Sequence, residues 1–565
     1  MRKYNRSLWA AVAVFAAFAL AACGSSSSST TSASSATTSS SSAAPAKSGG
    51  SVTFLYGVAP QSLDPGMDYT TQGGEINWVV YTPMVTYTHA NGNAGLKLIP
   101  GLATALPVIS DGGKTYTMYM RKGLVFSNGA PVTASSFVWA VERNIKIPWG
   151  GSGEFVTPVI QGATAYSSGK ASTISGITAN NTTGEIVIHL TAPYGLFDNV
   201  LAFPSMAPVP VGTPFKNEAT NPPPGVGPYK VTNIVPNTSF TAVPNPYWAK
   251  EAIPGIPSAK VTVDAKISSN VPANALSVLN NTADVFDWAD TIPGSLLPQI
   301  QAQASARFTK VDLGGSTYYM FLNSQEKPFN NQLAREAVVT GLNEEAMSRL
   351  GSGFTDPGCY FMPPALPGHL ANTTCPYGNP DSGGNLAKAR ALVKQSGFEG
   401  YPVTVWSEER DPRQAWMTYY TAYLNSIGFK ATQKLISDAV YWTTIGDLKL
   451  HPQTGFGDWN MDFNNPVDFY GVLLTGPSIL PVNNENFGEV NDPEINSLTD
   501  QIAATNNTST VESLATKLDV YTAQKAYVAV FGYQTFPKFT SDRINYSALV
   551  FHPVWGWDWT SFSLK

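Results

Sequence analysis

Charged side chains are scarce in this chain of 565 residues. Lys, Arg, Asp and Glu together make up 13%, whereas soluble proteins average roughly 25%. The formal net charge is −5, and no run of Lys and Arg stands out. Because binding to nucleic-acid phosphates depends on clustered basic side chains, this composition argues against a nucleic-acid partner. We expect a surface that is polar but largely uncharged.

Local motifs for catalysis and metal binding are also missing. The chain has no G-x-S-x-G and no H-E-x-x-H motif. Gly113-Lys114-Thr115 looks like the end of a phosphate-binding loop, but Val108 replaces the required first glycine, so a turn before a strand is predicted. We therefore expect no metal, no cofactor and no enzyme, with a secreted hydrolase that uses two carboxylates as the rival reading. Five histidines never fall at the spacing of metal ligands: His89, His189, His369, His451 and His552.

A long apolar run is present at the start of the chain. Three basic residues precede Leu8 to Ala22, which is short for a transmembrane helix, so residues 1–22 are predicted to be an export signal. The run ends in Leu20-Ala21-Ala22-Cys23, which resembles the lipobox of bacterial lipoproteins. We expect lipid on the thiol of Cys23 and a protein anchored outside the bacterial cell membrane. An ordinary signal peptide with a chance cysteine is the alternative.

Cysteine is rare after this point. Residues 24–50 are almost entirely Ser, Thr, Ala and Gly, and they cannot bury enough apolar surface to offset their ordering entropy. Together with Cys23, residues 23–50 are predicted to be a flexible tether. Only Cys359 and Cys375 follow. Outside the cytoplasm, two nearby thiols favour a disulfide over a metal or redox site, with a stabilisation of roughly 2–4 kcal/mol.

The body of the chain, residues 51–565, shows patterns of mixed α/β structure and is long enough for more than one lobe. Strands are predicted over 184–190, 401–407 and 429–437. Helices are predicted over 134–145 after Thr133, over 386–396 between Asn385 and Gly397, and over 412–427 with Asp411 as N-cap, Pro412 as first residue and Gly428 as stop. A strand, helix and strand in succession favour a parallel or mixed sheet. Alternation of Trp555, Trp557 and Trp559 predicts three indoles on one face of a strand, in the core.

Several segments in a fixed order resemble one family. They are "SLDP" (62–65), "LIPGLATAL" with "SDGGKTYTMYMRKGLVFSNGAPVTASSFVWAVER" (98–143), "GVGPYKV" with "VPNPYW" (225–248), "YYMFLNSQEKPFNNQLAREAVVTGLN" (318–343) and "DWNMDFNNPVDF" (458–469). Together they are similar to the extracytoplasmic solute-binding proteins of ABC importers, family 5, which includes oligopeptide and dipeptide binders. The chain departs from the family pattern at Ser127-Asn128-Gly129 and at Ala134 to Phe137, where two acids are lost.

The resemblance implies an α/β fold of the periplasmic-binding-protein type, class II, with two hinged lobes and an inserted domain. Lobe I would comprise residues 51–92, 205–310 and 535–565, the insertion 93–204, and lobe II 311–534. It further implies a monomer that closes on an oligopeptide or dipeptide and delivers it to a membrane permease with an ATPase. A sugar or metal chelate as the solute, or peptide sensing without transport, are the alternatives.

The segment "GDWNMDFNNP" (457–466) carries two carboxylates and no basic residue. By resemblance, Asp462 corresponds to the aspartate that holds the α-amino group of a peptide, and Trp459 to an aromatic near that pocket. We expect Phe463, which follows Asp462, to contact the ligand as well. A carboxylate without a protein partner is costly to desolvate, and a ligand ammonium would compensate it. The alternative is that Asp458 and Asp462 accept hydrogen bonds from the backbone of their own turn.

A ligand carboxylate would need a cation. Arg410 and Arg413 stand where a predicted strand ends and a helix begins, the edge at which α/β sheets bind ligands. The alternative is that neighbouring acids neutralise them at the surface: Glu408, Glu409 and Asp411.

Overall fold

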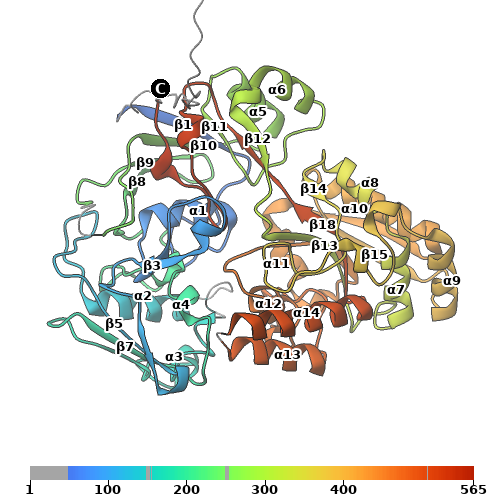
Figure 1. Cartoon of the computed structure of the whole chain (residues 1–565), viewed down its shortest axis with the longest axis horizontal. Helices are drawn as coiled ribbons and strands as arrows, with labels where there is room; N and C mark the ends of the chain where they lie inside the picture. Colours follow the sequence, from blue (N-terminus) through green and yellow to red (C-terminus); the bar gives the residue numbers. More distant parts are fainter. Residues whose placement is uncertain (1–48, 148–152, 154, 249–252, 506) are drawn as a thin grey trace, which may run out of the picture. The chain divides into compact units, whose positions relative to one another are not determined.

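The computed structural model describes residues 49–147, 153, 155–248, 253–505 and 507–565 (Figure 1). The predicted export signal and Cys23 lie outside the described residues, as does nearly all of the predicted tether. Among the helices that are described, none combines the length and the apolar character needed to cross a lipid bilayer.

The first sheet has five strands in the order β11–β1–β10–β9–β8. β1 pairs in parallel with β10 and β11, whereas β9 is antiparallel to both of its neighbours. Helix α1 packs against β8, and α5 against β11. The bounds are β1 (Ser51–Tyr56), β8 (Tyr229–Val235), β9 (Ser239–Pro244), β10 (Thr262–Ile267), β11 (Val285–Phe286), α1 (Thr71–Val80), α5 (Val271–Leu279) and α6 (Leu297–Ala304).

A four-stranded antiparallel sheet has the order β4–β5–β7–β6. β7 confirms the strand predicted over 184–190, and α2 follows Thr133 as predicted, with Phe137, Val141 and Ile145 buried. Arg143 of α2 donates to both carboxylate oxygens of buried Asp64, at 2.7 and 2.5 Å, which ties α2 to the segment after β1. The bounds are β4 (Val108–Ser110), β5 (Thr115–Tyr119), β6 (Ile177–Ala179), β7 (Glu185–His189), α2 (Ala134–Lys146), α3 (Ala163–Ser167) and α4 (Phe197–Val200), with the pair β2 (Val85–Tyr87) and β3 (Leu98–Pro100) before them.

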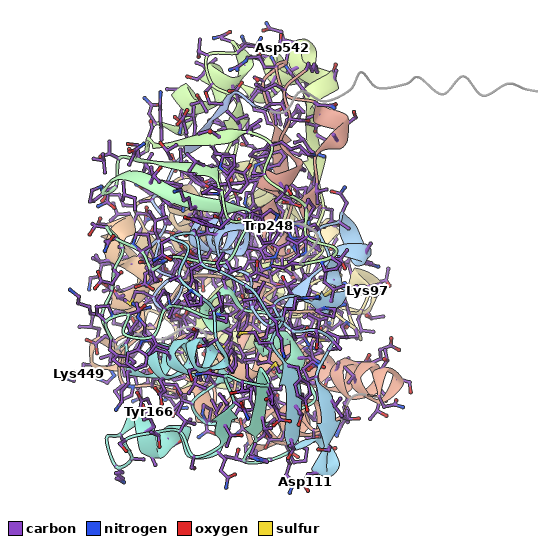
Figure 2. All side chains as sticks on the ribbon, turned by 90° about the vertical axis from the view of Figure 1, so that its left-hand side faces the viewer. Lys97, Asp111, Tyr166, Trp248, Lys449 and Asp542 are labelled. Carbon is purple, nitrogen blue, oxygen red and sulfur yellow. A yellow bond between two sulfur atoms is a disulfide. The ribbon has the colours of Figure 1, made fainter. Side chains whose placement is uncertain are left out.

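The turn before β5 is the one predicted for Gly113-Lys114-Thr115. Residues Asp111 to Gly113 form a short 3-10 turn, and the strand begins at Thr115. Asp111 lies at the margin of the molecule in Figure 2, paired with Lys114 at 3.5 Å. This surface turn is no phosphate-binding loop.

The largest sheet has six strands in the order β14–β18–β13–β17–β15–β16. β15 is parallel to β16 and β17, and the other pairs are antiparallel, which confirms the predicted mixed sheet. The strands are β13 (Ser316–Leu322), β14 (Thr355–Asp356), β15 (Pro402–Glu408), β16 (Lys430–Ile436), β17 (Thr454–Asn460) and β18 (Val528–Gln534). The helices are α7 (Gln332–Gly341), α8 (Glu344–Leu350), α9 (Leu386–Ser396), α10 (Arg413–Ile427), α11 (Tyr441–Ile445), α12 (Val467–Leu473), α13 (Pro493–Ala503) and α14 (Thr508–Lys525).

The ends of α9 and α10 show how well local sequence signals predict helix boundaries. α9 is capped by Asn385, whose side chain accepts from the N–H of Lys388, and it ends at Gly397 with φ 78°, both as predicted. α10 ends as predicted at Gly428, but it begins at Arg413 and not at Pro412. Pro412 is the N-cap, because its ψ of 1° lies outside the helical range and only its carbonyl joins the first turn.

A two-stranded ribbon joins the five-stranded and six-stranded sheets. β12 (Phe308–Val311) leads into β13, and β19 (Phe536–Phe539) follows β18, and the two connecting strands pair antiparallel (Figure 1). The four-stranded sheet lies within 93–204 and the six-stranded sheet within 311–534. The exact lobe boundaries stay a prediction.

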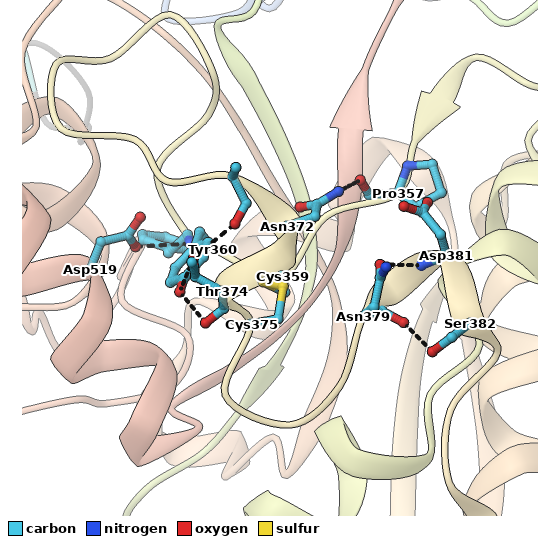
Figure 3. Close-up of a disulfide and its surroundings, with 12 residues drawn as sticks. Pro357, Cys359, Tyr360, Asn372, Thr374, Cys375, Asn379, Asp381, Ser382 and Asp519 are labelled. Carbon is cyan, nitrogen blue, oxygen red and sulfur yellow. Dashed lines mark hydrogen bonds between the residues drawn. A yellow bond between two sulfur atoms is a disulfide. The ribbon is translucent and has the colours of Figure 1, made fainter.

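Cys359 and Cys375 form the predicted disulfide, with Cα atoms 6.0 Å apart (Figure 3). The loop is also held by the hydroxyl of Tyr360, which donates to the carbonyl of Thr374 at 2.7 Å.

The three C-terminal tryptophans are all buried, which confirms their place in the core. The predicted single strand is wrong. Trp557 is in β21 (Gly556–Trp557), which pairs with β20 (Phe551–His552), whereas Trp559 begins a 3-10 turn. Gly556, at φ 70°, and the cap residue Asp558 break the extended chain on either side.

Candidate functional site

Asp462 lies in the loop that follows β17, where this loop meets the segment entering α1. Its half-buried carboxylate accepts a hydrogen bond from the hydroxyl of Tyr69. Beside it, the side-chain amide of Asn460 donates to the hydroxyl of Thr71 at 3.5 Å. These contacts join residues next to the five-stranded sheet with residues at the end of a strand of the six-stranded sheet.

Asp468, which sequence reasoning did not single out, builds this loop. Its Oδ2 accepts hydrogen bonds from the backbone N–H groups of Asp462, at 2.7 Å, and Phe463, at 3.3 Å. Its Oδ1 accepts from the indole N–H of Trp459 at 3.0 Å. Asp468 is therefore the residue that holds the turn, and this leaves the carboxylate of Asp462 directed to Tyr69. The sequence signal that could have pointed to Asp468 was its position inside the segment "DWNMDFNNPVDF".

The two carboxylates Asp462 and Asp468 are electrostatically unfavourable as a charged pair. Burial raises the pKa of Asp462, and the hydrogen bond from Tyr69 partly offsets this rise. Burial, together with the charge of Asp462, raises the pKa of Asp468 well above its usual range. Within the part of the chain that the structure describes, no Lys, Arg or His forms an ion pair with Asp462. A cation from outside the chain would stabilise its charged form.

The two aromatic residues of the segment differ in position. Trp459 is half-buried, and its ring centroid lies 6.1 Å from that of Tyr69, the residue that binds Asp462. The ligand role of Trp459 stays a prediction. Phe463 is fully buried against Phe155 and Phe203, with centroids 5.5 and 6.1 Å away. The structure therefore corrects the ligand role expected for Phe463, because its ring is already enclosed by the core.

Arg413 is not available to a ligand carboxylate. Its guanidinium donates to Glu408 and to Asp458, both at 2.6 Å, and it lies over the ring of Phe456 at 4.7 Å. Asp458 therefore receives its cation from a helix 45 positions away in the chain. The expectation that Arg413 faces a ligand is corrected. Of the neighbouring acids expected to neutralise it at the surface, Glu408 is a partner, but its carboxylate is buried.

Arg410 is also paired, but with a distant partner. It donates to the carboxylate of Asp290, which follows β11 and is buried, at 2.9 Å. We expected acids next to Arg410 in the sequence to neutralise it. Its partner in the structure is instead Asp290, which lies 120 positions away in the chain. Arg410 thus joins the same two sheets that Tyr69 and Asp462 join.

More acids gather around these contacts than the sequence indicated. Glu75 of α1 accepts from the indoles of Trp288 and Trp559. Asp287 accepts from Gln72 at 3.3 Å. Each of these contacts joins residues more than 200 positions apart, so no local pattern could have revealed them. Among the described residues, no group of His, Cys, Asp and Glu side chains is arranged to hold a metal ion.

The chain is similar to curated binding proteins along most of its length. It is 24% identical over 446 residues to the "Probable deoxycholate-binding periplasmic protein YgiS" of Escherichia coli strain K12, covering 76% of this chain and 79% of that protein. It is 25% identical over 439 residues to the "Oligopeptide-binding protein OppA" of Bacillus subtilis strain 168, covering 73% and 75%.

Solved structures share the fold. The "Clavulanic acid biosynthesis oligopeptide binding protein 2" superposes with a TM-score of 0.81 at 22% identity, covering 92% of this chain and 96% of that chain. Haemophilus influenzae OppA, solved in complex with the peptide RPPGFSPFR, gives a TM-score of 0.75 at 17% identity, covering 92% and 100%. The fold is therefore the two-lobed α/β fold of periplasmic binding proteins.

A family model decides the assignment. The model described as "Bacterial extracellular solute-binding proteins, family 5 Middle" matches residues 97–479, which is more than half of the chain. The chain belongs to family 5 of the bacterial extracellular solute-binding proteins.

Proposed function

We propose that this protein captures peptides outside the cell and delivers them to the permease and ATPase of an ABC importer, without changing the bonds of the ligand. The observation that carries this proposal is the carboxylate of Asp462. It is half-buried, held by Tyr69, and without an ion-pair partner among the described residues. A peptide α-ammonium group would supply both the charge and the hydrogen bonds that it lacks.

The proposed ligand position is where the segment before α1 meets the loop after β17. Tyr69 and Trp459 would border the bound amino terminus. Closure would bring lobe I (51–92, 205–310 and 535–565, with the insertion 93–204) toward lobe II (311–534) by bending near β12 and β19. Lipidated Cys23 would keep the protein at the outer face of the membrane, at the end of the tether.

The names of similar proteins support peptides as the solute. OppA of Bacillus subtilis is an oligopeptide-binding protein, and the Haemophilus influenzae protein was solved with a peptide bound. A hydrolase is the weaker reading, because Asp458 is bound to Arg413 and Asp468 is bound to its own turn. No pair of free carboxylates then remains at Asp462 for acid and base catalysis.

Native mass spectrometry of the purified body, from about Ser48 onward, tests the proposal. Peptides that copurify, or that bind from a mixed tetrapeptide library, are expected as added masses that fragment as peptides. Asp462→Asn should weaken binding of free-amine peptides by at least about 30-fold, because truncating one partner of a hydrogen-bonded charge pair costs about 2–5 kcal/mol. Asp500→Asn, on the exposed face of α13, is the matched control and should bind normally.

N-acetylated peptides are the second control, since they lack the ammonium group. A protein that ignores all peptides but gains the mass of deoxycholate, a sugar or a metal chelate would refute peptide capture while keeping the family. Equal affinity of the Asp462→Asn variant would refute the role of Asp462.

A further inference from the structure

A cavity of about 370 Å³ lies beside the ribbon that joins the five-stranded and six-stranded sheets. Residues of β12, the two residues after it and Lys538 of β19 line one side. The 3-10 turn Gly92–Leu96 and Phe551 contribute further lining residues. This volume lies in the range of small-molecule sites. None of the lining residues takes part in the contacts around Asp462, so the cavity is separate from the proposed peptide position.

The register of the ribbon explains why Lys538 faces this cavity. Thr309 of β12 is paired with Lys538 of β19, and the side chains of directly paired residues lie on the same face of a sheet. Val311 follows Thr309 at the spacing of one strand repeat and therefore shares this face. All three residues line the cavity. Thr309 and Asp312 are exposed, so the cavity opens to solvent on this side and a ligand can enter.

The ammonium group of Lys538 is poorly compensated by the protein. The side chain is half-buried, and its Nζ donates to one acceptor, the carbonyl of Leu549, at 3.3 Å. It also lies 4.9 Å from the ring centroid of Tyr546. Across the described residues, no acid forms an ion pair with it. Burial accordingly lowers the pKa of Lys538. An ammonium group has more donors than this one bond uses, so donors remain for an anion in the cavity.

Asp312, the acid that lines the cavity, does not supply this anion. Its Oδ1 accepts a hydrogen bond from the backbone N–H of Gly314 at 2.7 Å. It forms no ion pair with Lys538, and its side chain is exposed. The cavity therefore holds a half-buried cation and, at its exposed side, a separate carboxylate.

The cavity also has an apolar part. Leu96, Val311 and Leu313 are only partly buried, although they pack against the core. Phe551 and Pro553 are buried beside them. An apolar group in the cavity would cover the exposed parts of these side chains, which is favourable because it removes apolar surface from water.

We propose that this cavity is a second binding site, which takes a small carboxylate with an apolar body. The carboxylate would accept hydrogen bonds from the ammonium group of Lys538, and the body would pack on Leu96, Val311 and Phe551. A simple carboxylic acid and an apolar amino acid share this chemistry, but the amino acid carries an ammonium group that Asp312 can bind. The proposal does not depend on peptide capture, because a carboxylate without an amine offers no cation to Asp462.

Isothermal titration calorimetry of the purified protein with hydrocinnamate tests the proposal. Hydrocinnamide has the same shape without the charge and should bind about 10-fold or more weakly. Propionate lacks the ring and should also bind about 10-fold or more weakly. Phenylalanine, titrated into the Asp462→Asn variant, is hydrocinnamate with an added ammonium group. Tighter binding of phenylalanine would support an amino acid as the ligand, and weaker binding would support a simple acid.

Lys538→Met is the variant that removes the charge while keeping an unbranched side chain next to Tyr546. It should weaken hydrocinnamate binding about 10-fold or more and change hydrocinnamide binding by less than about 2-fold. Lys122→Met, at an exposed position after β5, is the matched control and should bind hydrocinnamate normally. Asp462→Asn should also bind it normally, since the acid has no amine.

Four results would overturn the proposal. They are no binding of hydrocinnamate, equal affinity for hydrocinnamide, equal affinity of the Lys538→Met variant, and loss of binding in Asp462→Asn, which would place the acid at the peptide position. The comparison with hydrocinnamide uses the unmodified protein, so a Lys538→Met variant that fails to fold leaves the test decisive. Absence of peptide binding in mass spectrometry would refute the proposed function and leave this site unaffected.

Discussion

The hydroxyl of Tyr69 donates a hydrogen bond to the carboxylate of Asp462, although the two residues lie 393 positions apart in the chain. One precedes the first helix, and the other follows a strand of the six-stranded sheet. This bond fixes one oxygen of Asp462 and lowers its pKa, while burial raises it. These opposing effects determine how ligand binding responds to pH and to the loss of the Tyr69 hydroxyl.

Binding of an amine ligand should depend on pH through Asp462. Its pKa is raised to about 7, so below pH 7 the free carboxyl is largely protonated and attracts an ammonium group weakly. Affinity should rise by up to about 10-fold per pH unit between pH 5 and 7, and fall again above pH 8, where α-amino groups of pKa about 7.7–8.0 lose their proton. Calorimetry at pH 5.5, 6.5, 7.5 and 8.5 measures this. Asp462→Asn should lose the dependence below pH 7, and an unchanged slope in that variant would contradict the prediction.

Asp462→Asn should also alter stability without ligand. The folded-state pKa of Asp462 lies above its ordinary value of 3.8, so the folded protein binds more protons than the unfolded one between about pH 4 and 7. The contribution of Asp462 to stability is therefore present in full below that range and is lost as the pH rises through 7. Relative to the unmodified protein, the variant should gain about 1–3 °C in Tm at pH 8 and nothing at pH 4. A loss of Tm at pH 8, measured by scanning calorimetry, would mean that the neutral amide cannot replace the charge at Tyr69.

Tyr69→Phe isolates the hydroxyl. The ring next to Trp459 remains, but the hydrogen bond that lowers the pKa of Asp462 is gone. The pH at which binding reaches half of its maximum should move upward by about 0.5–1 unit, and affinity at pH 7 should fall about 3-fold to 10-fold. A uniform loss of affinity at every pH, with the midpoint unmoved, would show that Tyr69 contacts the ligand directly and does not tune Asp462.

Arg413→Met should destabilise the fold. It leaves Glu408 and Asp458 without their cation, and removing one partner of a buried ion pair costs about 3–5 kcal/mol. Chemical unfolding in guanidinium chloride measures the loss. The triple variant that adds Glu408→Gln and Asp458→Asn should recover most of it, because no charge is then left unpaired.

Arg349→Met is the surface control for this change. Arg349 pairs with Glu345 on the exposed side of α8, and such i,i+4 pairs contribute about 0.3–0.5 kcal/mol. Equal losses for Arg349 and Arg413 would refute a structural role of the buried network.

The disulfide should stabilise the body as a closed loop. Cys359 and Cys375 are 16 positions apart, and a loop of this length restricts the unfolded chain by about 3 kcal/mol. Replacing both by Ser should lower the free energy of unfolding by about this amount. Reductant should destabilise the original protein to the same level and leave the double variant unaffected; a reductant effect on the variant would point to a cause other than this bond.

Signals that are local in the chain predicted several individual helices and strands. The N-cap Asn385, the stop residues Gly397 and Gly428, and the alternation around Ile186 each depend on a few neighbouring residues, and the structure confirms each. The start of α10 and the C-terminal strand were wrong, since both depend on backbone angles that tertiary packing selects at Pro412 and Gly556.

The sequence by itself determined the family, the mixed sheet, the disulfide and the segment that contains Asp462, because ordered motifs and short-range periodicity can be recognised in the linear sequence. Only the tertiary structure decided which charged side chains are already paired with other groups of the protein. In the structure, Arg413 pairs with Glu408 and Asp458, and Arg410 pairs with Asp290. Asp468 accepts hydrogen bonds within its own turn. Ion pairs depend on distance in space, and the partners come from elements that meet only after the sheets are packed. For that reason the charge left over for a ligand could not be read from the chain.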